Sequence, residues 1–422
     1  MNNIKKTICI LLTLCFAVNF TSCGENTSQE VIPDETTLAD MSETENDIEI
    51  LQLNKEYVSH YEWYEDYPEM LVRSEYSTVT LDKSIEKKYS ALAGALSEIS
   101  VMRKRTMEDE KDNLLTDATK EFMNDGEEFS TCVSMLDVQV RRADSIAVSI
   151  LEDYYSDFGR TFNGLNYDTE SGKLLALSDV VKDISEISSV AEKIIMNRIG
   201  EEEPFGETAV ADYFANTPQN DIDWTLDYNG VTFYFNAGAI APTNFGIQTV
   251  TVTFAEHPEL FNEKYTVVPD VYIVSLPVSS SFFTDVTGNN CMEEIIITGD
   301  CDIDGRYYNT LGVYCEDSFH NEEWSAYELD PYYVKTADGN SYIYVFSLNS
   351  EDENRETVLS VFSLKNGEVE FLGTSQIGML CKGKNIFALP TSPDVLLLDA
   401  YNGEIDSVFT AGQNGMPIKT AS

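Results

Sequence analysis

The segment GDCDIDG places three carboxylates at alternate positions, Asp300, Asp302 and Asp304, directly before Gly305. This D-x-D-x-D-G spacing is the front half of a calcium loop, in which alternate carboxylates converge on the ion and the glycine permits a sharp turn. A glutamate ligand is expected at the twelfth position, where this chain has Leu311. The motif predicts either a calcium site with an incomplete ligand set or an acidic hairpin tip that binds no ion.

The same segment predicts a β-hairpin that would bring two cysteines together. If the chain turns symmetrically about Ile303, strand 293–298 runs back along 308–313, and Cys291 lies opposite Cys315. Cysteines at a non-hydrogen-bonded pair of antiparallel strands are within reach of a disulfide bond. We expect Cys291 and Cys315 to be close in space, and bridged in an oxidising compartment.

The other cysteines do not suggest a zinc site. Of the eight cysteines, Cys9, Cys15 and Cys23 fall in the N-terminal leader described below, so an odd number is left and at least one thiol stays free. None is arranged as Cys-x-x-Cys, and the chain has only three histidines. We therefore expect no zinc.

Sequence motifs for catalysis are missing. There is no G-x-S-x-G nucleophile motif, no H-E-x-x-H and no glycine-rich phosphate loop. A catalytic pair of carboxylates, as in glycosidases, remains an alternative, because so acidic a chain contains many pairs of Asp and Glu residues. We therefore expect that the protein is not an enzyme. The alternative is a cell-wall glycan-modifying enzyme or an accessory subunit of one.

The N-terminal residues resemble a bacterial lipoprotein signal. Lys5 and Lys6 precede an apolar run, 7–20, that is short for a membrane span, and FTSC ends at Cys23. We expect a signal peptide over 1–22, lipidation of Cys23, and a disordered acidic tether over 23–50. An ordinary secretory signal and an uncut anchor are the alternatives. The predicted location is the outer face of the cell membrane.

The charge limits the partners. The chain has 73 acidic and 27 basic residues, a formal net charge of −46. Nucleic acid and anionic lipid would be repelled, whereas cationic proteins and calcium would be attracted. The alternative is that the acidic residues only keep the protein surface soluble and attract no particular partner.

The elements before residue 142 are expected to be strands and one long helix. Residues 51–81 have the composition of strands and contain an aromatic cluster that either packs a sheet face or stacks on sugars. Residues 82–121 repeat apolar side chains at three- and four-residue spacing, which is typical of an amphipathic helix. Strands are expected at 129–140 and 145–155. The aromatic cluster is Tyr57, Tyr61, Trp63, Tyr64 and Tyr67.

The segment 142–254 adds a hairpin, a helix and two more strands. Ser171-Gly172 and Asn229-Gly230 are turn dipeptides between apolar runs. Ser189 and Glu192 have the spacing of a capping box and predict the start of a helix, which Gly200 would end.

Phrases within this segment resemble the RsiV-like extracytoplasmic domain, a family shared by the lysozyme-sensing anti-sigma factor RsiV, PdaC-type peptidoglycan deacetylases and many lipoproteins. The resemblance implies an α+β fold with helices packed on an antiparallel sheet, and binding rather than catalysis. It makes a lysozyme-like muramidase one candidate ligand; a wall glycan is the other. The Asp-Asp motif and the His-x-x-x-His pair of the deacetylases have no counterpart. The matching phrases are RADS at 142–145, EDYYS at 152–156, NYDTESGKLLALSDVV at 166–181, NGVTFYFN at 229–236, IAP at 240–242 and GIQTV at 246–250.

The chain departs from this family in one loop. After YYS the family usually has a Gly-Gly-Ala-His loop, whereas 157–164 reads DFGRTFNG. We expect ligand contacts there and in the connection 236–246, since loops at a sheet end hold most irregular backbone. A shortened hairpin with no function is the alternative. The candidate ligand-binding residues are Asp157, Arg160, Phe162, Asn163, Ala241, Pro242 and Asn244.

Beyond Pro277 helical periodicity ends and turn dipeptides follow one another, at Asp338-Gly339, Asn366-Gly367 and Asn402-Gly403. Short apolar runs between turns are typical of an all-β meander. The expected organisation is an α+β domain over 51–275, with its family match at 142–254, followed by an all-β domain over 280–415. The expected function is that of a surface-tethered extracytoplasmic binding lipoprotein.

Overall fold

The computed structural model describes residues 48–64, 70–125, 129–199, 209–289, 291–301, 307–348, 357–376, 386–394, 396–401 and 404–420. Residues Asp47–Ser422 form one compact unit. The predicted signal peptide, the predicted lipidation site Cys23 and nearly all of the predicted tether lie outside the described residues. Within the described ranges, no helix has both the length and the apolar character that a membrane span requires.

The first large sheet is built mostly from the N-terminal half of the chain. Its strand order is β17-β1-β2-β3-β4-β5, and all neighbours are antiparallel except β2 and β3. The parallel pair is possible because a long helix, α1, connects β2 to β3. The predicted strands and the predicted helix are thus confirmed. The bounds are β1 Leu53–Trp63, β2 Met70–Leu81, α1 Ser90–Asp125, β3 Cys132–Ala143, β4 Ala147–Ser156, β5 Gly159–Asp168 and β17 Ile386–Ala388.

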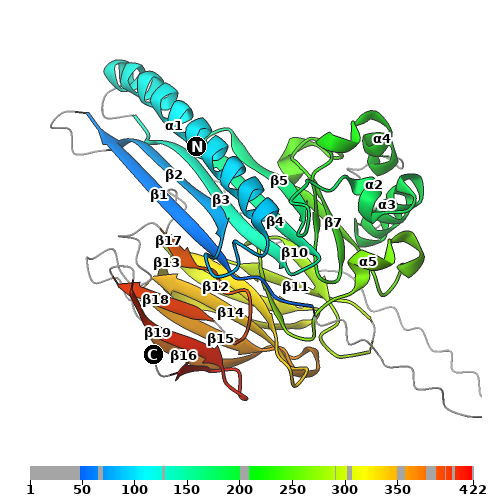
Figure 1. Cartoon of the computed structure of the whole chain (residues 1–422). Helices are drawn as coiled ribbons and strands as arrows, with labels where there is room; N and C mark the ends of the chain where they lie inside the picture. The colour runs from blue at the N-terminus through cyan, green and yellow to red at the C-terminus, as the bar shows by residue number, and fades with distance from the viewer. Residues whose placement is uncertain are drawn as a thin grey trace, which may run out of the picture. The chain divides into compact units, whose positions relative to one another are not determined.

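Helix α1 covers one face of this sheet (Figure 1). Leu92 and Leu96 are fully buried, and Met107 packs on Tyr76 of β2. The helix begins at Ser90 rather than at residue 82. The residues between form turns, because the carboxylate of Asp82 accepts a hydrogen bond from the Ser84 amide at 2.9 Å.

A smaller helical layer packs on a three-stranded sheet of order β6-β7-β8 (Figure 1). Its core joins Ile187 and Ile195 of α3 to Phe233 of β7 and Val250 of β8. The Asn229-Gly230 turn between β6 and β7 is confirmed. The bounds are α2 Leu177–Val180, α3 Ile184–Ile199, α4 Ala209–Asn216, β6 Trp224–Leu226, β7 Gly230–Phe235, β8 Gln248–Thr253 and α5 Glu263–Thr266.

The predicted capping box is wrong. Helix α3 begins at Ile184, where the side chain of Asp183 accepts hydrogen bonds from the amides of Ser185 (2.9 Å) and Glu186 (3.0 Å). Ser189 lies inside the helix and donates to the carbonyl of Ser185. The carboxylate of Glu192 accepts a hydrogen bond from the Ala211 amide in α4 at 2.9 Å, so it links two helices instead of starting one.

The C-terminal part is β-rich in the residues that the structure describes, in agreement with the predicted meander. Its main sheet runs β10-β11-β12-β13-β14-β15-β16, with β9 pairing to the far part of the long strand β13. A separate sheet has the order β18-β19-β20. The bounds are β9 Tyr272–Ser275, β10 Ser281–Thr284, β11 Glu293–Thr298, β12 Tyr307–Cys315, β13 Ser318–Lys335, β14 Ser341–Leu348, β15 Thr357–Ser363, β16 Glu370–Gln376, β18 Leu397–Tyr401, β19 Glu404–Ala411 and β20 Pro417–Thr420.

Strand pairing connects the two expected domains twice. Strand β17 pairs with β1, at Asn54↔Ala388, and β9 pairs with β13, at Val274↔Tyr333. Backbone hydrogen bonds therefore join segments on both sides of the expected boundary near residue 277.

The predicted disulfide is wrong, because the hairpin closes in another register. Ile295, not Cys291, lies opposite Cys315, and both cysteines are free. The apolar alternation of β11 and β12 is equally satisfied by registers that differ by an even number of residues, so it did not select the symmetric one. On either side of the undescribed segment 302–306, the amide of Asn309 donates to the carbonyl of Asp300 at 2.7 Å.

Candidate ligand-binding site

The segment 157–164 is not a long loop. Strand β5 begins at Gly159, and Ser156 pairs directly with Gly159, so only Asp157 and Phe158 form the turn. The carboxylate of Asp157 accepts a hydrogen bond from the Val133 amide at 3.1 Å. Phe158, at the tip, is 96% exposed.

The predicted ligand residues on β5 do not form one surface. Phe162 is a core residue, 2% exposed, whose ring packs against Tyr234 at a centroid distance of 5.3 Å. Asn163 points to the α1 face, where its amide donates to Glu152 at 2.6 Å. Arg160 points to the opposite face, because side chains alternate along a strand.

The connection 236–246 does lie beside β5. The amide of Phe162 donates to the side-chain oxygen of Asn236 at 2.7 Å, and the Asn236 side chain donates back to the Phe162 carbonyl at 3.0 Å. Ala241 is half-buried, whereas Pro242 and Asn244 are exposed. The structure brings this connection next to the edge of β5 that does not pair with β4, and not to the β4–β5 turn.

A cavity of about 420 Å³ lies on the helix-free face of the first sheet. One wall comes from β1 to β5, and most of its side chains lie on the side opposite α1. The other wall comes from the end of β9 and the segment after it, from the β11–β12 connection, from β12 and from β13. The lining includes Lys55, Tyr57, Arg73, Glu75, Met135, Asp137, Gln139, Asp153, Tyr155 and Arg160 on the first wall, and Ser275, Val278, Tyr308, Glu328, Asp330 and Tyr332 on the second.

The cations of the cavity are engaged in ion pairs within the first wall. Arg160 donates two hydrogen bonds to Asp153, at 2.7 and 2.5 Å, and a third to the carbonyl of Val278. The ammonium of Lys55 lies 2.5 Å from Asp137. The third pair, Arg73 with Glu75, has a distance of 2.9 Å.

Asp330 differs from the other carboxylates of the cavity. Among the described residues, its side chain has neither a hydrogen bond nor an ion pair, and it keeps some accessible surface. Burial raises its pKa to about 6, opposed by the charge of Lys55 and reinforced by that of Asp137. A carboxylate that protein atoms surround without pairing is a functional-site candidate.

Two further features of the lining concern recognition. Tyrosine side chains line the cavity from both walls, namely Tyr57, Tyr155, Tyr308 and Tyr332. The side-chain oxygen of Gln139 is buried and has no hydrogen-bond partner in the described part of the chain. Unsatisfied buried acceptors are uncommon, because each loses its hydrogen bonds to water.

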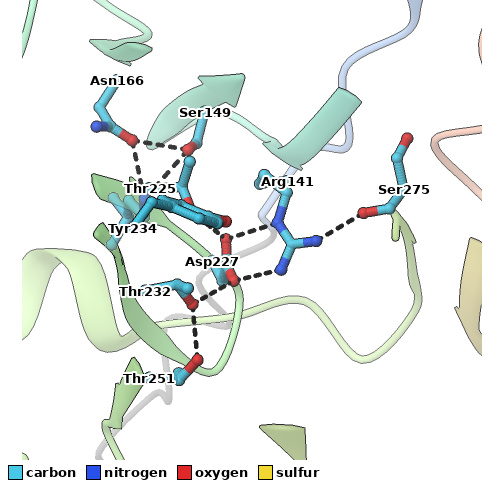
Figure 2. A network of polar contacts seen from close by, with 10 residues as sticks. Arg141, Ser149, Asn166, Thr225, Asp227, Thr232, Tyr234, Thr251 and Ser275 are labelled. Atoms are coloured by element: carbon cyan, nitrogen blue, oxygen red, sulfur yellow. Dashed lines mark hydrogen bonds and ion pairs between the residues drawn. The ribbon is translucent and has the colours of Figure 1, made fainter. Parts of the chain in front are cut away.

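A buried polar network fixes the two walls against each other (Figure 2). Arg141 of β3 makes a bidentate pair with Asp227 and donates to the carbonyl of Ser275 at 2.7 Å. Asp227 also accepts from Thr225 and Thr232, at 2.9 and 2.8 Å. The network ties β3, the β6–β7 turn and the end of β9 together at one edge of the cavity.

The calcium motif lies partly outside the described residues. Asp300 is exposed, and its amide donates to the Thr310 hydroxyl at 2.9 Å. Asp302 and Asp304 fall in the undescribed segment 302–306. In the ranges that the structure covers, no group of three or more His, Cys, Asp or Glu side chains is arranged to hold a metal ion.

The cavity was missed at the level of sequence, although a signal was present. Charged or polar residues alternate on several strands, as at Lys55 and Tyr57, at Arg73 and Glu75, and at Asp137 and Gln139. Such alternation is normally a solvent-facing sheet face. Here the C-terminal sheet covers that face, which local periodicity does not reveal.

The comparisons with known proteins identify one family. The family model described as "Protein of unknown function (DUF3298)" matches residues 177–255. A solved member of that family from Bacteroides fragilis NCTC 9343 is 13% identical, with 51% of this chain and 94% of that chain covered and a TM-score of 0.39. A DUF3298 family protein from Pseudomonas aeruginosa PAO1 is 14% identical, with 51% and 96% covered and a TM-score of 0.33. The search of curated proteins found no match. The chain thus contains a DUF3298 domain at residues 177–255.

Proposed function

We propose that this chain is a lipid-anchored extracytoplasmic binding protein, and that the cavity between the two large sheets holds its ligand. The cavity carries the proposal: its two walls come from both halves of the chain, and it is lined by charged and aromatic side chains. Ligand sites are commonly concave, with few polar groups that fix orientation.

The proposed ligand is a component of the cell envelope or the medium, either a wall glycan fragment or a group on a protein such as a lysozyme-like muramidase. The net charge of −46 favours cationic partners. Tyrosines on both walls favour a ligand with sugar or aliphatic faces. A muramidase would place a side chain in the cavity, and a glycan fragment would enter it directly.

Calorimetry with the purified full-length chain tests this function. Lysozyme and a mixture of soluble muropeptides are titrated separately, and binding of at least one is expected. Met135 lines the cavity, so Met135→Trp should obstruct it and abolish that binding. The matched control is Met102→Trp, at a helix position that is 49% exposed. Equal binding by both variants would exclude the cavity as the site.

The anchor has its own test. Cys23→Ala removes the thiol that lipidation requires, so the protein should leave the membrane fraction or remain an unprocessed precursor. Normal processing together with unchanged membrane association would refute the proposed lipoprotein.

A glycan-modifying enzyme is the second candidate, favoured by one observation. Asp330 has a pKa raised to about 6 and lies near the ion-paired carboxylate of Asp137. Glycoside hydrolysis requires a carboxylic acid that stays protonated near neutral pH and a second, ionised carboxylate. If the wild type releases muropeptides from purified wall and Asp330→Asn does not, this activity is established. If the wild type releases none, the protein is a binding protein and this second candidate fails.

A further inference from the structure

We propose that the cavity selects a protonated amine, whose ammonium group pairs with Asp330 while tyrosine rings surround its aliphatic part. This inference rests on the proposed ligand site and specifies the chemical class of the ligand. Three features of the lining lead to it.

The first feature is the charge that remains after internal pairing. Lys55, Arg73 and Arg160 are each within hydrogen-bonding distance of a carboxylate of the same wall. Asp330 faces the same cavity from the opposite wall without such a partner among the described residues. An anionic ligand would have to break an existing ion pair, whereas a cation would complete one.

The second feature is that the cavity atoms in need of a partner are hydrogen-bond acceptors. Asp330 offers carboxylate oxygens, and Gln139 has a buried side-chain oxygen that accepts no hydrogen bond from the described residues. Both are hydrogen-bond acceptors, so both require a donor. An ammonium group offers three N–H donors and a positive charge, so it supplies the donor that each of these acceptors lacks.

The third feature is the aromatic lining. Tyr57 approaches from the first wall, and Tyr308 and Tyr332 from the second. Tyrosine rings attract organic cations through their negative faces, and this attraction increases where water is excluded. A hydrated metal ion gains little from such rings, whereas an alkylammonium or amino-sugar ligand gains both contact area and charge stabilisation.

The volume sets the size of the ligand. A cavity of about 420 Å³ lies at the lower end of the range for small-molecule sites, roughly 300–1,000 Å³. An amino sugar or an amino-acid side chain with its neighbouring backbone fits this range. A long polymer would enter by one terminal group only.

The test compares amines with their acetylated forms, which differ in one charge. Glucosamine is paired with N-acetylglucosamine, and Nα-acetyl-lysine amide with its Nε-acetylated derivative, by calorimetry at pH 7.5 on the full-length chain. Each amine should bind more tightly than its neutral partner by about 10-fold or more, since losing one member of a desolvated charge pair has at least that effect. Equal affinity within both pairs, or no amine binding at all, would overturn the inference.

Variants test whether Asp330 is the residue that binds the amine. Asp330→Asn keeps the shape of the side chain and should lower amine affinity about 10-fold or more while leaving the neutral partner unchanged. Asp270→Asn, on an exposed loop carboxylate, should have no effect. A normal thermal transition of Asp330→Asn verifies its fold. Unchanged amine affinity in Asp330→Asn would overturn the role of this residue.

The outcomes also distinguish this inference from the proposed function. If neutral or anionic envelope fragments bind and Met135→Trp abolishes their binding, the ligand site stands and the amine class is wrong. If amines bind equally well to Met135→Trp and to the wild type, the cavity itself is the wrong site, and both proposals fail.

Discussion

The guanidinium group of Arg141 donates two hydrogen bonds to the carboxylate of Asp227, at 3.1 and 2.6 Å, where the two side chains are only 2% and 0% exposed. The pair lies between β3 and the β6–β7 turn, with Thr225 and Thr232 donating to the same carboxylate (Figure 2). Removing one partner of such a pair leaves a buried charge without compensation.

Asp227→Asn should therefore lower the free energy of unfolding by about 3–5 kcal/mol. Chemical denaturation monitored by circular dichroism measures this change. The control is Asp109→Asn, which removes a surface pair with Arg105 at 3.9 Å and should change stability by about 0.5 kcal/mol or less. Similar losses for both variants would contradict the structural role assigned to the buried pair.

Asp330 should make the folded state less stable as the pH rises, whereas carboxylates in folded proteins usually have the opposite effect. Burial raises its pKa from 3.8 to about 6, so the folded state binds a proton more readily than the unfolded state. The penalty for ionising Asp330 is therefore absent below pH 4 and complete above pH 7. It amounts to about 2 kcal/mol, using 1.4 kcal/mol per pKa unit with some discount for accessible surface.

The measurement compares the wild type with Asp330→Asn at pH 5 and pH 8. The variant carries no ionisable group at this position, so its stability relative to the wild type should increase as the pH rises. Lys55 and Asp137, the charged neighbours that influence Asp330, are present in both proteins and largely cancel in the difference. A difference that stays constant between the two pH values would refute the raised pKa.

The cysteines should react as separate thiols. Cys291 is exposed, whereas Cys315 is fully buried, and burial together with nearby Glu293 and Glu316 raises the pKa of Cys315 to about 12. Maleimide should label Cys291 in the native protein and Cys315 only after unfolding. A non-reducing peptide map that joins the two cysteines would show that the observed register is wrong.

Two glycines should respond in opposite ways to alanine. A Cβ atom at Gly164 would lie 1.8 Å from the carbonyl oxygen of Trp224, so Gly164→Ala should destabilise the protein by about 3 kcal/mol. Gly94 in α1 has open space around it, so Gly94→Ala should stabilise by up to about 1 kcal/mol. Thermal denaturation distinguishes the two signs, and equal shifts would contradict the close contact between β5 and β6.

Calcium remains a prediction of the motif at Asp300, Asp302 and Asp304. A ligand that binds only the folded state raises the melting temperature. Millimolar calcium should therefore stabilise the wild type but not Asp302→Ala. Absence of any shift in the wild type would leave an acidic turn without an ion.

Local patterns predicted most elements, and non-local contacts explain the errors. The three- and four-residue spacing of Leu92 and Leu96 predicted α1, and Asn229-Gly230 predicted the β6–β7 turn; both are confirmed. Ser189 and Glu192 had the spacing of a capping box, yet Glu192 accepts a hydrogen bond from Ala211 in a different helix. A capping box is judged from four residues, whereas this contact joins two helices.

The candidate site was less predictable than the fold. Phe162 was expected at a ligand surface because 157–164 was interpreted as a loop at the end of the sheet, but the residue lies in β5 and belongs to the core. Asp330 was not among the predicted residues, because nothing in the sequence around a single aspartate in a strand marks it as functional. Its place in the cavity depends on the packing of β13 against the first sheet, which no local pattern predicts.

The pairing of β1 with β17 has a consequence for the order in which the molecule is made. The side chain of Gln52, just before β1, donates to the carbonyl of Leu389, 337 positions later in the chain. Contacts at such sequence separation form slowly, because the intervening chain must first be confined. During translation β1 leaves the ribosome long before β17 is synthesised. Until then the edge of β1 is exposed to solvent or bound by a chaperone. Completion of this sheet is thus a late step in folding, and a nascent chain stalled before residue 386 would display an unprotected strand edge.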